Sequence, residues 1–239
     1  MHFMHLTFSF FLYDYFLYSK YDYYNNKGTN EKMDIELVRN NLILFLLVGH
    51  DSTSSLLTSL MFLLSQHPEV EEKMRNEVDQ VMGGEPPDMQ NIKNLPYTMA
   101  VIKETLRLYP PAQAILKTCM KDTTLGPYTM TEGCKVLLLP RELHRNKTLW
   151  GDNADEFDPS RFMLNSPNVP SHEHAWMPFS SGPRGCIGMQ FSLIEARVIL
   201  ARIMQRRITF RLHKDAEVGE KFRTVSFEMP FFVLNSIFS

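Results

Sequence analysis

The segment from Asn40 to Gln66 most constrains the fold, because "NNLILFLLVGHDSTSSLLTSLMFLLSQ" predicts one long helix with apolar residues on nearly every side. A helix of that kind is expected to be buried. Near its middle, however, Gly49, His50 and Asp51 are followed by four hydroxyl side chains at 52–55. Burying so many polar groups costs free energy unless they find partners. The helix is therefore expected to face something polar at this point.

Composition narrows the classes of protein to consider. The 239 residues suffice for one sizeable domain or two small ones, and 44% hydrophobic with 22% charged residues is typical of a globular chain. A net charge of -2 gives no basis for binding nucleic acid. Three cysteines, Cys119, Cys134 and Cys186, argue against a disulfide scaffold. They favour a reducing compartment, so we expect an intracellular protein, in the cytoplasm or at the cytoplasmic face of a membrane.

Residues 1–32 differ in composition from the remainder, 33–239. The first 26 residues hold six of the nine tyrosines and contain no Gly, Pro, Ala, Val or Ile. They lack the basic start and cleavage site of a signal peptide, and polar residues interrupt a run too short to span a membrane. An interfacial anchor and translated non-coding sequence are the two interpretations, and we favour the second.

Periodicity and turn signals predict the order of elements. Helices are expected from Asp34 to Gln66, from Pro68 to the glycine pair at 83–84, and over 97–109 before a proline pair. Short strands and hairpins follow at 115–140, then a loop-rich stretch at 141–184. An amphipathic helix follows Cys186, and a strand hairpin ends the chain.

The stretch "FSSGPRGCIG" at 179–188 is the most specific motif. Its three glycines and one proline predict a tight turn that a flat ligand can approach closely. Cys186 lies at the start of a predicted helix, where free backbone N–H groups favour a thiolate. Arg184 can grip a carboxylate with two hydrogen bonds, and Phe179 can pack beneath the turn.

This stretch resembles the haem-binding loop of the cytochrome P-450 family, whose pattern is Phe-x-x-Gly-x-Arg-x-Cys-x-Gly. The five specified positions are Phe179, Gly182, Arg184, Cys186 and Gly188. The resemblance implies that Cys186 is the axial thiolate of haem iron (haem b) and that Arg184 binds a propionate. It implies a fold that is mainly helical with small β-sheets, the C-terminal half of the family's catalytic domain, and hence a truncated chain at 33–239.

The stretch "KETLR" places Glu104 and Arg107 three residues apart on one helix face. Alone, such a pair is usually a surface ion pair of little value. The family has this Glu-x-x-Arg motif together with an arginine from a later loop, which "FDPSRF" supplies as Arg161. The resemblance implies a structural triad.

The polar patch of the long helix resembles the family's oxygen-activating kink above the haem. Gly49 would let the backbone approach bound oxygen, and Asp51 and Ser52 would relay protons. Val48 stands where the family usually has alanine, and Ser52 replaces the usual threonine. The alternative is a packed kink without function.

The remaining resemblances to the family are less specific. Ala112 and Ala114 fall where relatives line the substrate pocket beside the haem, as Val48 does above it, and a turn near Phe227–Pro230 is expected to close that pocket. Taken alone, each is ordinary packing. Cys119 and Cys134 match nothing in the family.

The resemblance implies a monooxygenase that inserts one atom of O₂ into a C–H bond of a lipophilic substrate. Electrons would come from NADPH through a separate flavoprotein or ferredoxin reductase. The runs "HRNKTLWGDNADEF" and "HDSTS" resemble the fatty-acid-hydroxylating branch, so a fatty acid is the first substrate expected. The alternatives are a non-catalytic remnant and a haem-thiolate isomerase or dehydratase that needs no O₂. The presence of Asp51 and Ser52 argues against the latter.

Overall fold

The computed structural model describes residues 35–170, 172–212 and 232–235. Fifteen elements lie in these ranges, and they are named here in chain order. The helices and 3-10 turns are α2 (Ile35–Gln66), α3 (Pro68–Met82), η1 (Asn91–Asn94), α4 (Pro96–Leu108), α5 (Pro140–Leu143), α6 (Lys147–Trp150), η2 (Pro159–Phe162), η3 (Glu173–Ala175) and α7 (Met189–Gln205). The strands are β1 (Ile115–Thr118), β2 (Thr123–Leu125), β3 (Tyr128–Met130), β4 (Lys135–Leu138), β5 (Thr209–Leu212) and β6 (Phe232–Asn235). The prediction of a mainly helical chain with small sheets is confirmed.

The chain divides into two compact units, 1–51 and 52–239, and the division falls inside α2. The Asp34 helix start and the segment 1–32 lie outside the described residues. Within the described ranges, α2 alone is long and apolar enough to cross a membrane by length and composition, a test that buried helices of soluble proteins also pass.

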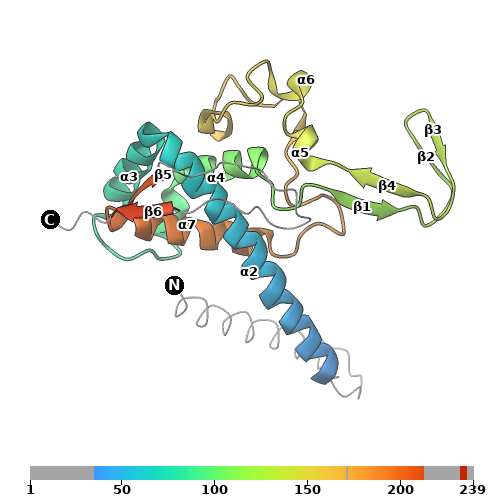
Figure 1. The fold of residues 1–239 in the computed structure, drawn as a ribbon, viewed down its shortest axis with the longest axis horizontal. Coiled ribbons are helices and arrows are strands. Elements are labelled where there is room, and N and C mark those ends of the chain that lie inside the picture. The colour runs from blue at the N-terminus through green and yellow to red at the C-terminus, as the bar shows by residue number, and fades with distance from the viewer. Residues whose placement is uncertain (1–34, 171, 213–231, 236–239) are drawn as a thin grey trace. The chain divides into compact units, whose positions relative to one another are not determined.

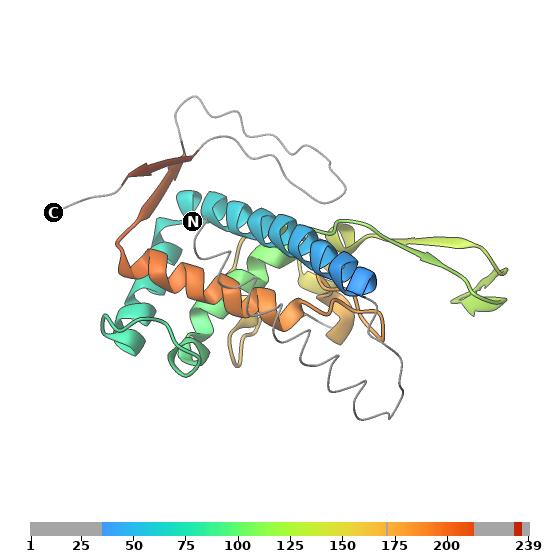
Figure 2. The same ribbon diagram turned by 90° about the horizontal axis from the view of Figure 1, so that it is seen from below.

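The core of the second unit is built on α3, α4 and α7, which contact one another (Figures 1 and 2). Apolar positions three and four apart turn inward, as Leu56, Leu60 and Leu64 do from α2. Glu77 of α3 caps the first turn of α4: its carboxylate accepts hydrogen bonds from the amides of Tyr97 at 2.6 Å and Thr98 at 2.8 Å. The beginning of α4 is thereby fixed to α3.

The strands form three separate antiparallel pairs, β1 with β4, β2 with β3 and β5 with β6. β1 and β4 pair from Ile115 opposite Leu138 to Thr118 opposite Lys135. They form a ribbon that carries β2 and β3 at its outer end (Figure 1). After β4 the chain continues into α5 and then into the loop-rich stretch 141–184, which contains part of the site described below.

Candidate functional site

The Cys186 loop connects η3 to α7 and is closed by its own backbone. The Cys186 amide donates to the Phe179 carbonyl at 2.9 Å, and the Gly185 amide donates to the Gly182 carbonyl at 2.9 Å. Helix α7 begins at Met189, three residues after the cysteine. Cys186 is a free, exposed thiol, and Phe179 is half-buried against the core.

Two glycines of this loop stand where a larger residue would introduce strain or a tight contact. Gly182 has a φ of 78°, in the left-handed region that other residues adopt only with strain. A Cβ on Gly185 would lie 3.2 Å from the Gly182 carbonyl oxygen. Ser180 also has a positive φ, 62°. The turn is therefore tightly specified, and it holds Cys186 outward.

The loop residues fit a flat, largely apolar ligand with carboxylate substituents, as haem is. The thiol is exposed, and Ile187 beside it is 81% exposed, which leaves apolar surface next to a sulfur of the kind that can bind a metal. Arg184 is exposed, and among the described residues its guanidinium makes no hydrogen bond or ion pair. It is therefore available to a carboxylate.

Glu104, Arg107 and Arg161 meet in the interior, each with its side chain fully buried. Arg107 donates from Nε to Glu104 Oε2 at 2.7 Å and from Nη2 to Oε1 at 2.8 Å. Arg161 Nε lies 3.5 Å from Glu104 Oε1, an ion pair rather than a hydrogen bond. One carboxylate thus faces two guanidinium groups.

Backbone carbonyls satisfy most of the remaining donors of the two arginines. Arg107 donates to the carbonyls of His144, Ala154 and Glu156. Arg161 donates to those of Trp150 at 3.0 Å and Asn153 at 2.7 Å. All five acceptors lie in the loop-rich stretch 141–184, so the triad holds that stretch against α4.

His144 joins the same network and was not identified from the sequence. Its Nδ1 lies 3.0 Å from the Arg107 carbonyl, and its Nε2 accepts the Met177 amide at 2.9 Å. Because Nε2 accepts, Nδ1 carries the proton and the ring is neutral. Burial lowers the pKa of His144 to about 4. Through this ring the network reaches Met177, two residues before Phe179.

Trp176 provides a second connection between α4 and the Cys186 loop. Its indole Nε1 donates to the Lys103 carbonyl at 3.1 Å, and its ring lies 6.2 Å from that of Phe179. No motif pointed to this residue, although a tryptophan needs a partner for its N–H when buried.

The polar patch of α2 is part of an uninterrupted helix. Val48, Gly49 and His50 are exposed, with Val48 at 54%, while Asp51 and Ser52 are half-buried. A Cβ on Gly49 would meet nothing within 4 Å outside its own helix backbone. Glycine weakens a helix by about 1 kcal/mol relative to alanine, and the described residues give no packing reason for it here.

Further along α2 the hydroxyl side chains become buried. Thr53, Ser55 and Ser59 are at most 4% exposed. Ser59 donates to the Ser55 carbonyl at 3.0 Å, one turn earlier. The buried hydroxyl of Ser55 itself has no hydrogen-bond partner among the described residues, so bonding back to the preceding turn accounts for Ser59 but not for the polar patch at 52–55.

Ala112 and Ala114, predicted to line a substrate pocket, are half-buried in the segment before β1, and Gln113 between them is buried. The turn near Phe227–Pro230 lies outside the described residues.

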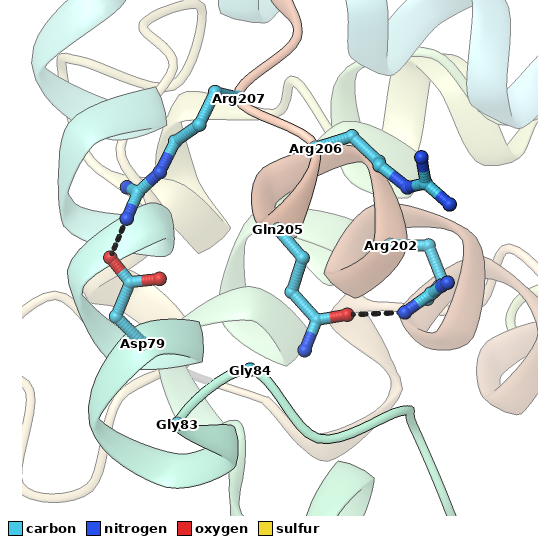
Figure 3. A pocket seen from close by; sticks show the side chains of 7 residues that line it. All are labelled: Asp79, Gly83, Gly84, Arg202, Gln205, Arg206 and Arg207. Atoms are coloured by element: carbon cyan, nitrogen blue, oxygen red, sulfur yellow. Dashed lines mark hydrogen bonds and ion pairs between the residues drawn. The ribbon is translucent and has the colours of Figure 1, made fainter.

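The structure has a hollow of about 610 Å³ away from the expected substrate pocket, at the C-terminal ends of α3 and α7 (Figure 3). Arg207 pairs there with Asp79 at 2.9 Å. None of the predicted site residues lines this hollow. Its lining consists of Asp79, Gly83, Gly84, Arg202, Gln205, Arg206 and Arg207.

The mainly helical fold, the cysteine loop and the buried triad are the features expected of a cytochrome P-450 chain. Comparison with known families agrees, since residues 11–230 match the cytochrome P-450 family. The chain belongs to this family. The matched range begins inside the segment 1–32 that composition set apart.

The regions that match individual relatives cover most of this chain but only a small part of each relative. Secologanin synthase 2 of Catharanthus roseus is 42% identical over 68% of the chain and 31% of its own length. The bifunctional cytochrome P-450/NADPH–P-450 reductase 2 of Bacillus subtilis (strain 168) is 40% identical over 77% of the chain and 17% of its own length. Cytochrome P-450 709B1 of Arabidopsis thaliana is 38% identical over 77% of the chain and 36% of its own length. The chain spans about a third or less of the length of these relatives.

Proposed function

We propose that this protein acts as a haem-thiolate monooxygenase, inserting one oxygen atom from O₂ into a C–H bond of a lipophilic substrate. The observation that carries the proposal is the exposed Cys186 thiol, held outward by a closed glycine turn beside an arginine without a partner among the described residues. Cytochrome P-450 membership supports the same chemistry.

In this proposal the loop residues hold haem b. Cys186 would give its thiolate to the iron, Arg184 would bind a propionate, and Gly182 and Gly188 would leave room for the macrocycle beside the backbone. When bound, haem supplies the activation of O₂, which the electron-rich thiolate favours. Phe179 and Trp176 anchor the loop from the core side.

The residues on α2 serve the opposite task, proton delivery. Gly49 leaves open space beside the helix, and Asp51 and Ser52 can pass protons from solvent because both are half-buried rather than enclosed. An isomerase or dehydratase does not reduce O₂ and therefore needs no proton relay. The presence of Asp51 argues against these alternatives.

The electrons are proposed to come from NADPH through a separate reductase. Support comes from the Bacillus subtilis relative, whose name joins a cytochrome P-450 to an NADPH-dependent reductase. Location in the cytoplasm or at the cytoplasmic face of a membrane remains part of this proposal.

A fatty acid is the proposed substrate, from the resemblance of the stretches at 144–157 and 50–54 to the fatty-acid-hydroxylating branch. Titration of the haem-loaded chain with a long-chain fatty acid, and separately with a terpenoid of similar size, tests the choice. A saturable change in the haem absorption with the fatty acid alone supports it. A saturable change with the terpenoid alone would reject the fatty acid as the substrate.

The proposal itself is tested by the absorption difference spectrum of the reduced, CO-treated chain after reconstitution with haem. The red-shifted band of thiolate-ligated haem is expected for the wild-type chain and for Cys119→Ser, and is expected to disappear in Cys186→Ser. If Cys186→Ser retains the band, the ligand is another residue. If wild type shows no such band, the chain does not bind haem through a thiolate.

A further inference from the structure

Two cysteines that the proposed function does not use lie directly opposite each other across the β1–β4 ribbon. The pairing of Thr118 with Lys135 ends the regular ladder, and Cys119 and Cys134 are the residues immediately beyond it on the two chains of the ribbon. The Cys119 amide donates to the Cys134 carbonyl at 2.8 Å. Residues opposed across antiparallel strands project to the same face of the sheet, so the two thiols share one face.

A β-bulge sets the geometry of this pair. The Gly133 amide donates to the Cys119 carbonyl at 2.8 Å, so Gly133 and Cys134 together oppose Cys119. Gly133 has a φ of 82°, as the first residue of a glycine bulge requires. Opposed, hydrogen-bonded residues have Cα atoms about 5.5 Å apart. Disulfides span Cα separations of about 4.4–6.8 Å.

We propose that Cys119 and Cys134 are a dithiol site that forms a reversible disulfide with small disulfide oxidants such as oxidised glutathione. Both side chains are half-buried and free, so a small reagent can reach them. One thiolate attacks the external disulfide, forming a mixed disulfide and releasing one thiol. The other cysteine then attacks the protein sulfur of that bond and releases the second thiol. Two electrons and two protons pass from the protein to the oxidant.

The bond would close the segment 119–134 into a ring that contains β2 and β3 (Figure 1). A cross-link at this place constrains the outer end of the ribbon and leaves the Cys186 loop unchanged. Cys186 has no cysteine opposite it among the described residues, so in the haem-free chain the same oxidant should leave a mixed disulfide there.

The test treats the full native chain with oxidised glutathione, blocks remaining thiols and digests with trypsin. Lys121 lies between the two cysteines, so the disulfide leaves peptides 118–121 and 122–135 joined until a reductant separates them. The expected result is this linked pair as the main product at Cys119 and Cys134, with glutathione on Cys186 only in the haem-free chain.

A matched control moves one thiol to the other face. In the double variant Cys134→Ser, Lys135→Cys the new cysteine pairs with Thr118 in the ladder and projects away from Cys119. We expect glutathione adducts there rather than a cross-link. Stable glutathione adducts on both native cysteines would overturn the proposal. Equally fast cross-linking in the control would also overturn it, because the bond would then result from proximity along the chain alone.

Discussion

At the scale of single residues, His144 is the most informative side chain. Both ring nitrogens are used, one toward the Arg107 carbonyl and one toward the Met177 amide. A second proton on the ring would have to displace the Met177 N–H donor. Burial and this hydrogen bond act in the same direction, and the ring remains neutral at physiological pH.

His144 should make the free energy of unfolding depend on pH. Its folded-state pKa is lowered to about 4, from an ordinary value of 6.5. Stability is therefore fully present above pH 6.5 and declines as pH falls toward 4, because the unfolded state binds the proton more readily. We expect a loss of roughly 2 kcal/mol between pH 7 and pH 5, measured by urea unfolding followed by circular dichroism. His144→Gln should flatten this dependence, whereas the exposed His174→Gln should retain it. An unchanged slope in His144→Gln would assign it to other groups.

Gly185 and Gly49 should respond oppositely to the same substitution. A Cβ at Gly185 would lie 3.2 Å from a backbone oxygen, whereas one at Gly49 meets nothing within 4 Å. We expect Gly185→Ala to destabilise by about 1–3 kcal/mol and to reduce thiolate-ligated haem. Gly49→Ala should stabilise its helix by about 1 kcal/mol and leave haem ligation intact. Chemical unfolding and the CO difference spectrum measure both. Equal effects of the two variants would contradict this assignment.

At the scale of elements, the buried triad is what attaches the irregular stretch 141–184 to α4. The attachment rests on arginine side chains that donate to backbone carbonyls of the stretch, next to a small apolar cluster around Trp150 that the stretch forms by itself. Such a connection depends on the charge balance at Glu104.

Glu104→Gln should therefore be far more damaging than loss of a neighbouring exposed pair. It leaves Arg107 and Arg161 buried without their counter-ion, which costs roughly 3–5 kcal/mol. The matched control is Asp155→Asn, which removes a pair with Arg145 whose carboxylate side is 62% exposed. That pair should contribute about 0–1 kcal/mol. Urea midpoints of the two variants provide the comparison, and similar losses would mean that the triad is not the attachment.

The sequence predicted elements with periodicity and failed where periodicity is absent. Helices α3 and α4 end within about a residue of the expected positions, since Gly83 adopts the left-handed cap and Pro110 follows α4. The short helices between residues 140 and 184 have three or four residues, too few to show a period. His144 was missed because its partners lie 37 and 33 residues away. A sequence motif identified the cysteine loop, whereas the contacts by which Trp176 and Met177 hold it are visible only in the folded structure.

At the scale of the whole molecule, exposed apolar surface gathers on the first half of α2. Leu44 is 57% exposed and Leu47 66% exposed, with further large apolar side chains exposed between 37 and 48. Contiguous apolar surface of this kind promotes association between molecules.

Polar substitution on this surface should reduce self-association of the chain. We expect Leu44→Gln with Leu47→Gln to shift the sedimentation of the purified chain toward monomer. Leu164→Gln is the control, because Leu164 is 90% exposed and lies outside this helix. An equal shift in the control would mean that the α2 surface is not the cause.

Both tryptophans of the chain lie in the network that supports the Cys186 loop. Trp150 is 3% exposed with the Arg107 guanidinium 4.9 Å from its ring centre, and Trp176 contacts Phe179. The indole fluorescence therefore originates from two places, the buried triad at Trp150 and the core side of the Cys186 loop at Trp176. Its wavelength reports whether the triad is intact, and its quenching by energy transfer to haem would measure cofactor binding without an added label.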